Sequence, residues 1–341
     1  MKIVFAHFGK RLPEHLLLNI SRCLSLFPSN QIVLITNRDC KVKDFENLEI
    51  YRYTESDDWH DLDKGLAHPK DFRENFWFTS IARFLAIESY MEEYPEALIH
   101  VESDVILARD FPFASFSNFD CDLAYPIVSL TQGIASTLYV RSFMAAQKLA
   151  NFSLEQVKRD PSTTDMIILR NFFEAFPNLV RILPIGPIKL NCYRTFLDDN
   201  LLCQMGRSFE LLGGIIDGAD IGYYTYGVDP RNSRGIKIIR KGIGSNYLDV
   251  SKTELIYSES RNFLNFWDSN LNFSIPIFSL HIHSKDLKLF PVPKSSKYLK
   301  SGVRRYLEKE SYEFVPRIFL VSLIAALKRR LVLAYEEIKN A

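Results

Sequence analysis

The first 53 residues alternate between apolar runs and an amphipathic segment. The runs at 2–8 and 31–36 are almost continuously apolar and predict buried strands. Between them, apolar residues recur at three- and four-residue intervals over 12–26, which predicts an amphipathic helix. A strand, a helix and a strand in this order predict a right-handed βαβ unit with parallel strands. A short strand is also expected at 50–53.

The rest of the chain predicts further helices and strands of an α/β fold. The polar stretch 57–70 is interpreted as a loop. Helices are predicted at 74–91, 138–152, 165–176 and 217–226, strands at 97–101, 123–125 and 277–283, and an extended edge or loop at 182–185. The fold class is therefore α/β, with a mixed central sheet flanked by helices.

The strongest candidate chemistry lies where the apolar run 97–101 ends in acids. Glu102 and Asp104 are two residues apart, so strand alternation would point both to one side. Ligands of open α/β sheets gather beyond the carboxyl ends of strands. An acid-x-acid pair there can bind a hard divalent cation together with phosphate oxygens. The alternative is a strand that runs into a polar turn.

A second candidate group follows the late strand. His281 and His283 are two residues apart, so strand alternation would place both on the same side of the strand. Ser284 and Lys285 follow directly. An imidazole could complete the metal coordination, and Lys285 could neutralise a diphosphate. The alternative is a structural role for the histidines.

A glycine-rich region, 213–222 and on to 227–232, carries two more acids. Asp217 and Asp220 are neighbours on one predicted helical turn, and the glycines allow a ligand to approach closely. A helix cap followed by an Asp-Pro turn explains the same residues without catalysis. The pattern is neither GxGxxG after a strand nor a P-loop, which disfavours Rossmann and P-loop enzymes.

Two charged residues on predicted helices have two interpretations each. Asp165 opens a helix, where it is either an N-cap or a sugar-binding carboxylate. Arg83 lies at the centre of the 74–91 helix, where it is either a solvated charge or a partner of Glu102 and Asp104.

Composition narrows the class of protein. The 341 residues are 47% hydrophobic, and 42 basic side chains balance 41 acidic ones. This indicates a globular chain and gives no reason to expect nucleic acid as a partner. Five widely spaced cysteines without a CxxC pair, and an N-terminus unlike a signal peptide, predict free thiols and a cytoplasmic location.

The segment 291–341 differs from the rest. It contains eleven Lys or Arg and five Glu, and its stretch 315–327 is strongly apolar. That stretch is shorter than the ~20 residues that span a bilayer. We expect a basic, amphipathic helical extension that either lies on the inner face of a membrane or packs against the domain or a second copy of the chain.

In their order, the βαβ unit, the helix that carries Arg83, the acid-x-acid strand end and the His-x-His-Ser-Lys strand end resemble the GT-A glycosyltransferases. The resemblance covers 1–290, divided into a nucleotide-binding half (1–130) and an acceptor-side half (131–290). It implies Mn²⁺ or Mg²⁺ bound by Asp104 first, by Glu102 second, and by His281 or His283. Most members have Asp where this chain has Glu102, which weakens the case for direct ligation by Glu102.

The resemblance also implies roles for other residues. Contacts to the sugar nucleotide are expected from the first strand, from the metal region and from the segment after the acidic strand: Ala6, His7, Phe8, Arg83, Glu102, Ser103, Gly133 and Lys285. Asp165 and Asp217 resemble acids that contact sugar hydroxyls or face the acceptor. An inverting enzyme would need Asp217 or Asp220 as its base, whereas a retaining enzyme would not; the sequence leaves the two open.

The function implied is transfer of a sugar, of hexosyl type, from a nucleotide-diphosphate sugar to a glycan or lipid-linked acceptor in bacterial polysaccharide synthesis. A UDP-sugar is the expected donor. The alternatives are another metal-dependent nucleotidyltransferase or phosphohydrolase, and a non-catalytic sugar-binding or membrane-peripheral assembly protein. A basic, glycine-rich loop after the first strand would favour the nucleotidyltransferase or phosphohydrolase, and the chain has only the short segment Gly9-Lys10-Arg11 there.

Overall fold

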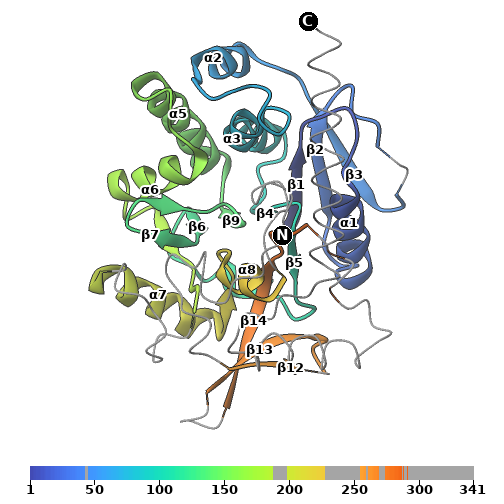
Figure 1. Ribbon diagram of the computed structural model, residues 1–341, viewed down its shortest axis with the longest axis vertical. Helices are drawn as coiled ribbons and strands as arrows, with labels where there is room; N and C mark the ends of the chain where they lie inside the picture. The colour runs from blue at the N-terminus through green and yellow to red at the C-terminus, as the bar shows by residue number, and fades with distance from the viewer. Residues whose placement is uncertain are drawn as a thin grey trace, which may run out of the picture.

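The computed structural model describes residues 1–42, 45–186, 198–226, 254–258, 260–268 and 273–285, together with 287 and 290. Its central sheet has seven strands in the order β10-β6-β9-β4-β1-β2-β3 (Figure 1). Neighbours are parallel except β9, which is antiparallel to β4 and β6. The predicted mixed sheet is therefore confirmed. Its strands are β1 (Lys2–His7), β2 (Ile32–Asn37), β3 (Leu48–Tyr53), β4 (Leu98–Val101), β6 (Leu123–Tyr125), β9 (Thr137–Val140) and β10 (Val180–Ile182).

Helices cover both faces of this sheet, which explains its continuous apolar runs. Along β1, Val4 belongs to one buried apolar cluster, whereas Ile3 and Phe5 belong to another. The second cluster contains the apolar side of α1 (Glu14–Leu26). The cluster that contains Val4 includes buried residues of the helices on the other face (Figure 1). These helices are α2 (Asp57–Gly65), α3 (Phe76–Glu93), α5 (Phe143–Arg159) and α6 (Asp165–Ala175).

A second sheet pairs β5, which directly follows the acid turn (102–104), with strands from the last part of the described chain. Its order is β11-β14-β13-β12, and β5 pairs with β14. The β5–β14 pairing is antiparallel and sets His281 opposite Val105. Consequently the end of a late strand lies beside the turn that follows β4. The strands are β5 (Val105–Leu107), β11 (Ile215–Ile216), β12 (Glu254–Ser258), β13 (Phe263–Asp268) and β14 (Phe273–His281).

The remaining elements are short or peripheral. A small two-stranded pair follows β6, and α7 begins at a side-chain cap, because Asp198 accepts a hydrogen bond from the Leu201 amide. These elements are α4 (Phe113–Phe116), β7 (Ile127–Ser129), β8 (Gln132–Gly133), α7 (Asp199–Leu212) and α8 (Asp220–Tyr226). The helices predicted at 12–26, 74–91, 165–176 and 217–226 are confirmed within a few residues.

Two predicted elements are wrong. The stretch 57–70, interpreted as a loop, contains α2, whose N-cap Ser56 accepts a hydrogen bond from the Trp59 amide. Trp59 and Leu62 are buried three residues apart, so two apolar contacts hold this otherwise acidic helix. The helix predicted at 138–152 begins later, because Thr137–Val140 forms β9 and Ser142 caps α5.

Several predictions concern residues outside the described part of the chain. The turn at 227–232, Cys192 and the extension 291–341 belong there, together with the expected membrane or subunit contact. The other four cysteines, Cys23, Cys40, Cys121 and Cys203, are free thiols, as predicted. Among the described helices, none combines the length and apolar character that crossing a bilayer requires. The division of 1–290 into two halves stays a prediction.

Candidate functional site

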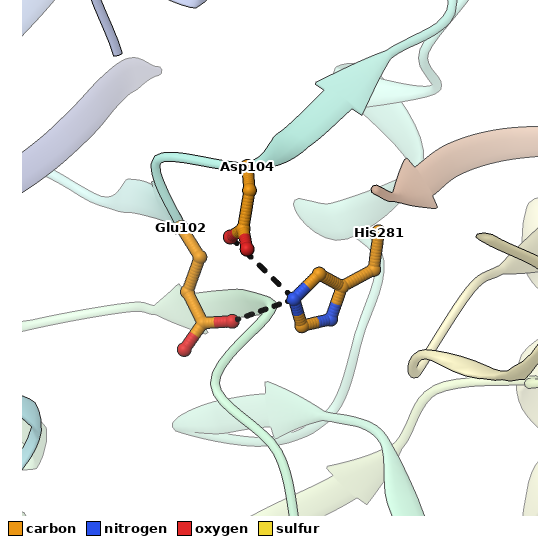
Figure 2. Close-up of side chains that lie close together, drawn as sticks. All are labelled: Glu102, Asp104 and His281. Carbon is orange, nitrogen blue, oxygen red and sulfur yellow. Dashed lines mark ion pairs between the residues drawn. The ribbon is translucent and has the colours of Figure 1, made fainter. Parts of the chain in front are cut away.

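The predicted acids lie in the tight turn that joins β4 to β5. The Glu102 amide donates to the Ser136 carbonyl at 3.1 Å, and the Val105 amide donates to the Glu102 carbonyl at 3.0 Å. The turn therefore has a fixed backbone, and both carboxylates project from it toward the end of β14 (Figure 2).

Helix α1 holds this turn from outside through two side chains that the sequence did not reveal. The buried Asn19 amide group donates to the Val105 carbonyl at 2.7 Å and to the Ser103 carbonyl at 3.3 Å. His15 Nε2 is hydrogen-bonded to Ser103 Oγ at 3.1 Å. Both residues look like ordinary polar positions of an amphipathic helix, so only the tertiary contact identifies them.

His281 completes a cluster of three candidate metal ligands. Its Nε2 lies 3.6 Å from Glu102 Oε2 and 3.5 Å from Asp104 Oδ1 (Figure 2). On the other side of the ring, Nδ1–H donates to the Gly218 carbonyl at 3.2 Å. This bond keeps a hydrogen on Nδ1, so that when the ring is neutral the Nε2 lone pair is the one available to a metal ion.

The three side chains fit a divalent cation. One ligand atom from each lies within 4.8 Å of the others. Two carboxylates and one imidazole, with the second imidazole nitrogen fixed by a carbonyl, suit a hard or borderline ion such as Mg²⁺ or Mn²⁺. His283 lies next to this cluster, because its ring stacks on His281 with centroids 4.3 Å apart.

Arg83 pairs with Glu102, as one of the two interpretations predicted, but its second carboxylate partner is Asp165 instead of Asp104. Its Nη1 donates to Glu102 Oε1 at 2.5 Å, and its Nη2 donates to Asp165 Oδ2. Burial lowers the pKa of Arg83, but the two carboxylates outweigh burial and raise it. The guanidinium therefore occupies one oxygen of Glu102 and leaves Oε2 on the side of His281. Thr164, not Asp165, is the side-chain cap of α6.

Lys285 and His281 together keep Asp104 ionised by lowering its pKa. Lys285 Nζ lies 2.6 Å from Asp104 Oδ2. Burial raises the pKa of Asp104, but Lys285 and His281 outweigh it and hold that pKa well below its usual range. Burial likewise lowers the pKa of His281, whereas Asp104 and Glu102 bring it to about 9. In the metal-free protein this cluster is thus a network of paired charges.

Asp217 and Asp220 occupy different environments. The fully buried Asp217 carboxylate accepts hydrogen bonds from the backbone amides of Ala219, Ile221, Gly222 and His281, and thereby caps α8. Burial raises its pKa. This geometry matches the helix-cap interpretation. Asp220, also buried, lines the cavity described next.

Helix α8 packs directly on the backbone of His281. A Cβ built on Gly222 would lie 1.9 Å from the His281 carbonyl oxygen, so only glycine allows this approach. The glycine-rich region therefore serves close packing of α8 against the end of β14.

A cavity of about 600 Å³ opens over these side chains. Every residue predicted for the site lines it except Gly133 and Asp217. Gly133 lies in β8, where a Cβ would approach the Leu169 side chain at 2.9 Å, and its neighbour Ile134 lines the cavity instead. The predicted lining residues are Ala6, His7, Phe8, Arg83, Glu102, Ser103, Asp104, Asp165, Asp220, His281, His283 and Lys285.

The cavity also has an aromatic rim that the sequence analysis missed. Phe72, Phe76 and Trp77 line it, and Phe72 and Phe76 are exposed. Between them, Arg73 and Glu74 line the cavity with positive φ angles of 50° and 59°. Left-handed backbone at consecutive non-glycine residues is uncommon and persists only where the surroundings hold it.

The comparisons with known proteins concern structure alone. No family model and no curated protein matches the sequence. Among solved structures, the chain is similar to mouse xyloside xylosyltransferase 1 (9% identity, TM-score 0.38), over 54% of this chain and 84% of that one. Similarity to an active-site mutant of LgtC reaches 15% identity and a TM-score of 0.40, over 54% and 73% of the two chains.

A third similar structure is the PaToxG glycosyltransferase, with 10% identity and a TM-score of 0.37 over 62% of this chain and 74% of that one. Two of these three proteins are thus named as glycosyltransferases. The TM-scores are too low to assign the chain to a family. Only the residues of the cavity therefore point to a function.

Proposed function

We propose that this protein is a glycosyltransferase that moves a sugar from a nucleotide-diphosphate sugar to a glycan or lipid-linked acceptor. The observation that carries the proposal is the convergence of Glu102, Asp104 and His281 in one cavity that also holds Arg83 and Lys285. Such a set binds a divalent cation and, through it, the oxygens of a diphosphate.

Side chains of the cavity would stabilise the leaving nucleoside diphosphate, either through the cation or directly. Glu102, Asp104 and His281 would hold the cation, which would supply Lewis-acid stabilisation of the leaving nucleoside diphosphate. His281 is oriented for this by the Gly218 carbonyl, and Glu102 is oriented by Arg83. Lys285 places a further positive charge beside the leaving group, where preorganised charge is most effective.

Asp220 is the better candidate for an acceptor-side base. It lines the cavity, whereas the Asp217 carboxylate is engaged by four backbone amides as a cap. Asp165 is engaged with Arg83 and contributes by fixing that guanidinium. If the enzyme is inverting, we propose Asp220 as its general base.

The nucleoside has a proposed place at the end of β1. Ala6, His7 and Phe8 line the cavity there, and Phe8 is supported by an edge-to-face contact with Trp59 at 4.9 Å. A UDP-sugar as donor, a hexosyl group as the transferred sugar, the choice between Mn²⁺ and Mg²⁺, and a cytoplasmic location stay predictions.

The test is thermal denaturation of the full chain with UDP-, GDP- and CMP-sugars, each with and without Mn²⁺. We expect one nucleotide to raise the melting temperature only when Mn²⁺ is present, because ligand bound to the native state alone stabilises it. Asp104→Asn should abolish this rise. Glu210→Gln, an equivalent change on the exposed side of α7, should leave it intact.

Product analysis separates the competing activities. Release of nucleoside diphosphate from a sugar nucleotide supports sugar transfer, to an acceptor or to water. Release of pyrophosphate from a nucleoside triphosphate would instead support a nucleotidyltransferase. Failure of every sugar nucleotide to stabilise the wild-type protein with Mn²⁺ contradicts the proposal.

A further inference from the structure

Lys285 occupies one oxygen of a proposed metal-binding carboxylate. Its Nζ lies 2.6 Å from Asp104 Oδ2, while the other oxygen, Oδ1, lies 3.5 Å from His281 Nε2. The Asp104 side chain is 7% exposed and that of Lys285 is 23% exposed. The ammonium group thus reaches the carboxylate from the cavity side, the same side from which an ion and its ligand must arrive.

The backbone fixes where Lys285 begins. Its amide donates to the Ile282 carbonyl at 2.8 Å, and the Ile282 amide donates to the Asp104 carbonyl at 2.8 Å. The residue itself has φ of 59°, in the left-handed region that lysine rarely adopts. Two consecutive tight contacts therefore tie the lysine to the acid turn, and only its flexible side chain is left to move.

The charges in this part of the site explain why the ammonium lies there. Arg83 shares its single positive charge between Glu102 and Asp165, both within hydrogen-bond distance. Asp104 does not contact Arg83 and instead pairs with Lys285. A buried carboxylate without a cationic partner is strongly unfavourable. Before any divalent cation binds, Lys285 is the first of two cationic partners of Asp104, and His281, 3.5 Å from Oδ1, is the second.

A divalent cation at the same carboxylate would meet this ammonium at close range. Two positive charges a few ångströms apart repel each other strongly in a partly buried site. A diphosphate relieves the repulsion, because its oxygens accept hydrogen bonds from the ammonium group and also ligate the cation. Lysine has the flexible stem that such a change of partner needs.

On the basis of the function proposed above, we infer that Lys285 is a stand-in cation that makes metal binding depend on the diphosphate. Without nucleotide, Lys285 and the metal compete for Asp104. With nucleotide, Lys285 transfers to the diphosphate and the metal takes its place. Metal and nucleotide then strengthen each other's binding by the same factor, as linkage requires.

The test is a titration of the full-length protein with Mn²⁺, following free Mn²⁺ by electron paramagnetic resonance, alone and with UDP or inorganic pyrophosphate. Lys285→Met keeps most of the stem and removes the charge. We expect it to bind Mn²⁺ alone at least about tenfold more tightly than wild type, because the competing charge is gone. The enhancement by UDP or pyrophosphate should shrink by about the same factor.

Three further variants complete the design. Lys285→Arg keeps the charge and should behave like wild type in Mn²⁺ binding without nucleotide. Lys285→Gln provides the same comparison if Lys285→Met does not fold. Lys158→Met, at an exposed position in α5, should change neither titration.

Unchanged or weaker binding of Mn²⁺ alone by the uncharged variants would overturn the inference, even if a sugar nucleotide stabilises wild type. The proposed function fails differently, by the absence of any metal-dependent response of wild-type protein to sugar nucleotides.

Discussion

Replacing Asn19 by Leu tests whether α1 positions the metal-binding turn. Leucine has the same number and branching of side-chain heavy atoms, so the change removes the amide without opening a cavity. Two hydrogen bonds are lost, to the Val105 carbonyl at 2.7 Å and to the Ser103 carbonyl at 3.3 Å. Each buried acceptor left without a donor costs about 1–3 kcal/mol.

One effect of the substitution partly offsets this loss of unfolding free energy. Asn19 Oδ1 is buried without a hydrogen-bond partner among the described residues, and leucine removes that oxygen. The Ser103 bond is also long, so we take the Val105 bond as the larger contribution. The net loss of unfolding free energy should then be about 1–3 kcal/mol, measured by urea denaturation. Mn²⁺ affinity in the presence of UDP should fall as well, because the turn that carries both acids loses its brace.

Asn30→Leu is the matched control. Asn30 also donates its amide to a backbone carbonyl, that of Met1, at 2.9 Å. Because β1 and β4 are parallel, Met1 lies at the amino ends of these strands and the acid turn lies at their carboxyl ends. The control should lose stability without losing Mn²⁺ affinity. Equal Mn²⁺ affinity in Asn19→Leu and wild type would refute the positioning role.

Two other predictions concern buried charge. Arg83→Leu leaves the buried Asp165 carboxylate and the half-buried Glu102 carboxylate without their common cation, which should lower the unfolding free energy by roughly 3–5 kcal/mol. Arg83→Lys should restore only part of this free energy. Full recovery in urea denaturation would contradict the arrangement in which one guanidinium bridges both carboxylates. Burial, with Arg83 nearby, lowers the pKa of His100 from 6.5 to about 3. The unfolded chain therefore binds the extra proton first, so this contribution to stability is complete above about pH 6.5 and falls by about 1.4 kcal/mol per pH unit as the pH drops toward 3. Urea denaturation at several pH values should show that slope, and His100→Asn should reduce it.

Most of the residues selected from the sequence line one cavity in the structure. The acid turn and the His281 strand end could be found because both follow apolar strands, whose carboxyl ends carry ligands in α/β sheets. Asn19 could not, since one buried amide in an amphipathic helix has no distinctive pattern. Gly133 and Asp217 were placed in the site by resemblance, and packing and helix capping explain them instead.

The two wrong elements have identifiable physical causes. In α2, acidic residues outnumber apolar ones, and Trp59 and Leu62 alone anchor the helix. In β9, the apolar residues run on toward the helix that follows, so the periodicity merged two elements into one. Only the antiparallel pairing with β4 and β6 distinguishes β9 from the first turn of α5.

The pairing of β5 with β14 has a consequence for how the protein matures. It joins partners such as Asp104 and Lys285 that are 181 residues apart in the chain. At ~5–20 residues per second, a ribosome makes the carboxylates roughly 10–35 s before it makes the groups that pair with them. During that interval the nascent chain holds the acids without their imidazole and ammonium partners. Binding of an ion by all three ligands therefore requires that β14 has already paired with β5. A chain truncated before β14 should retain the acid turn but lack the complete site.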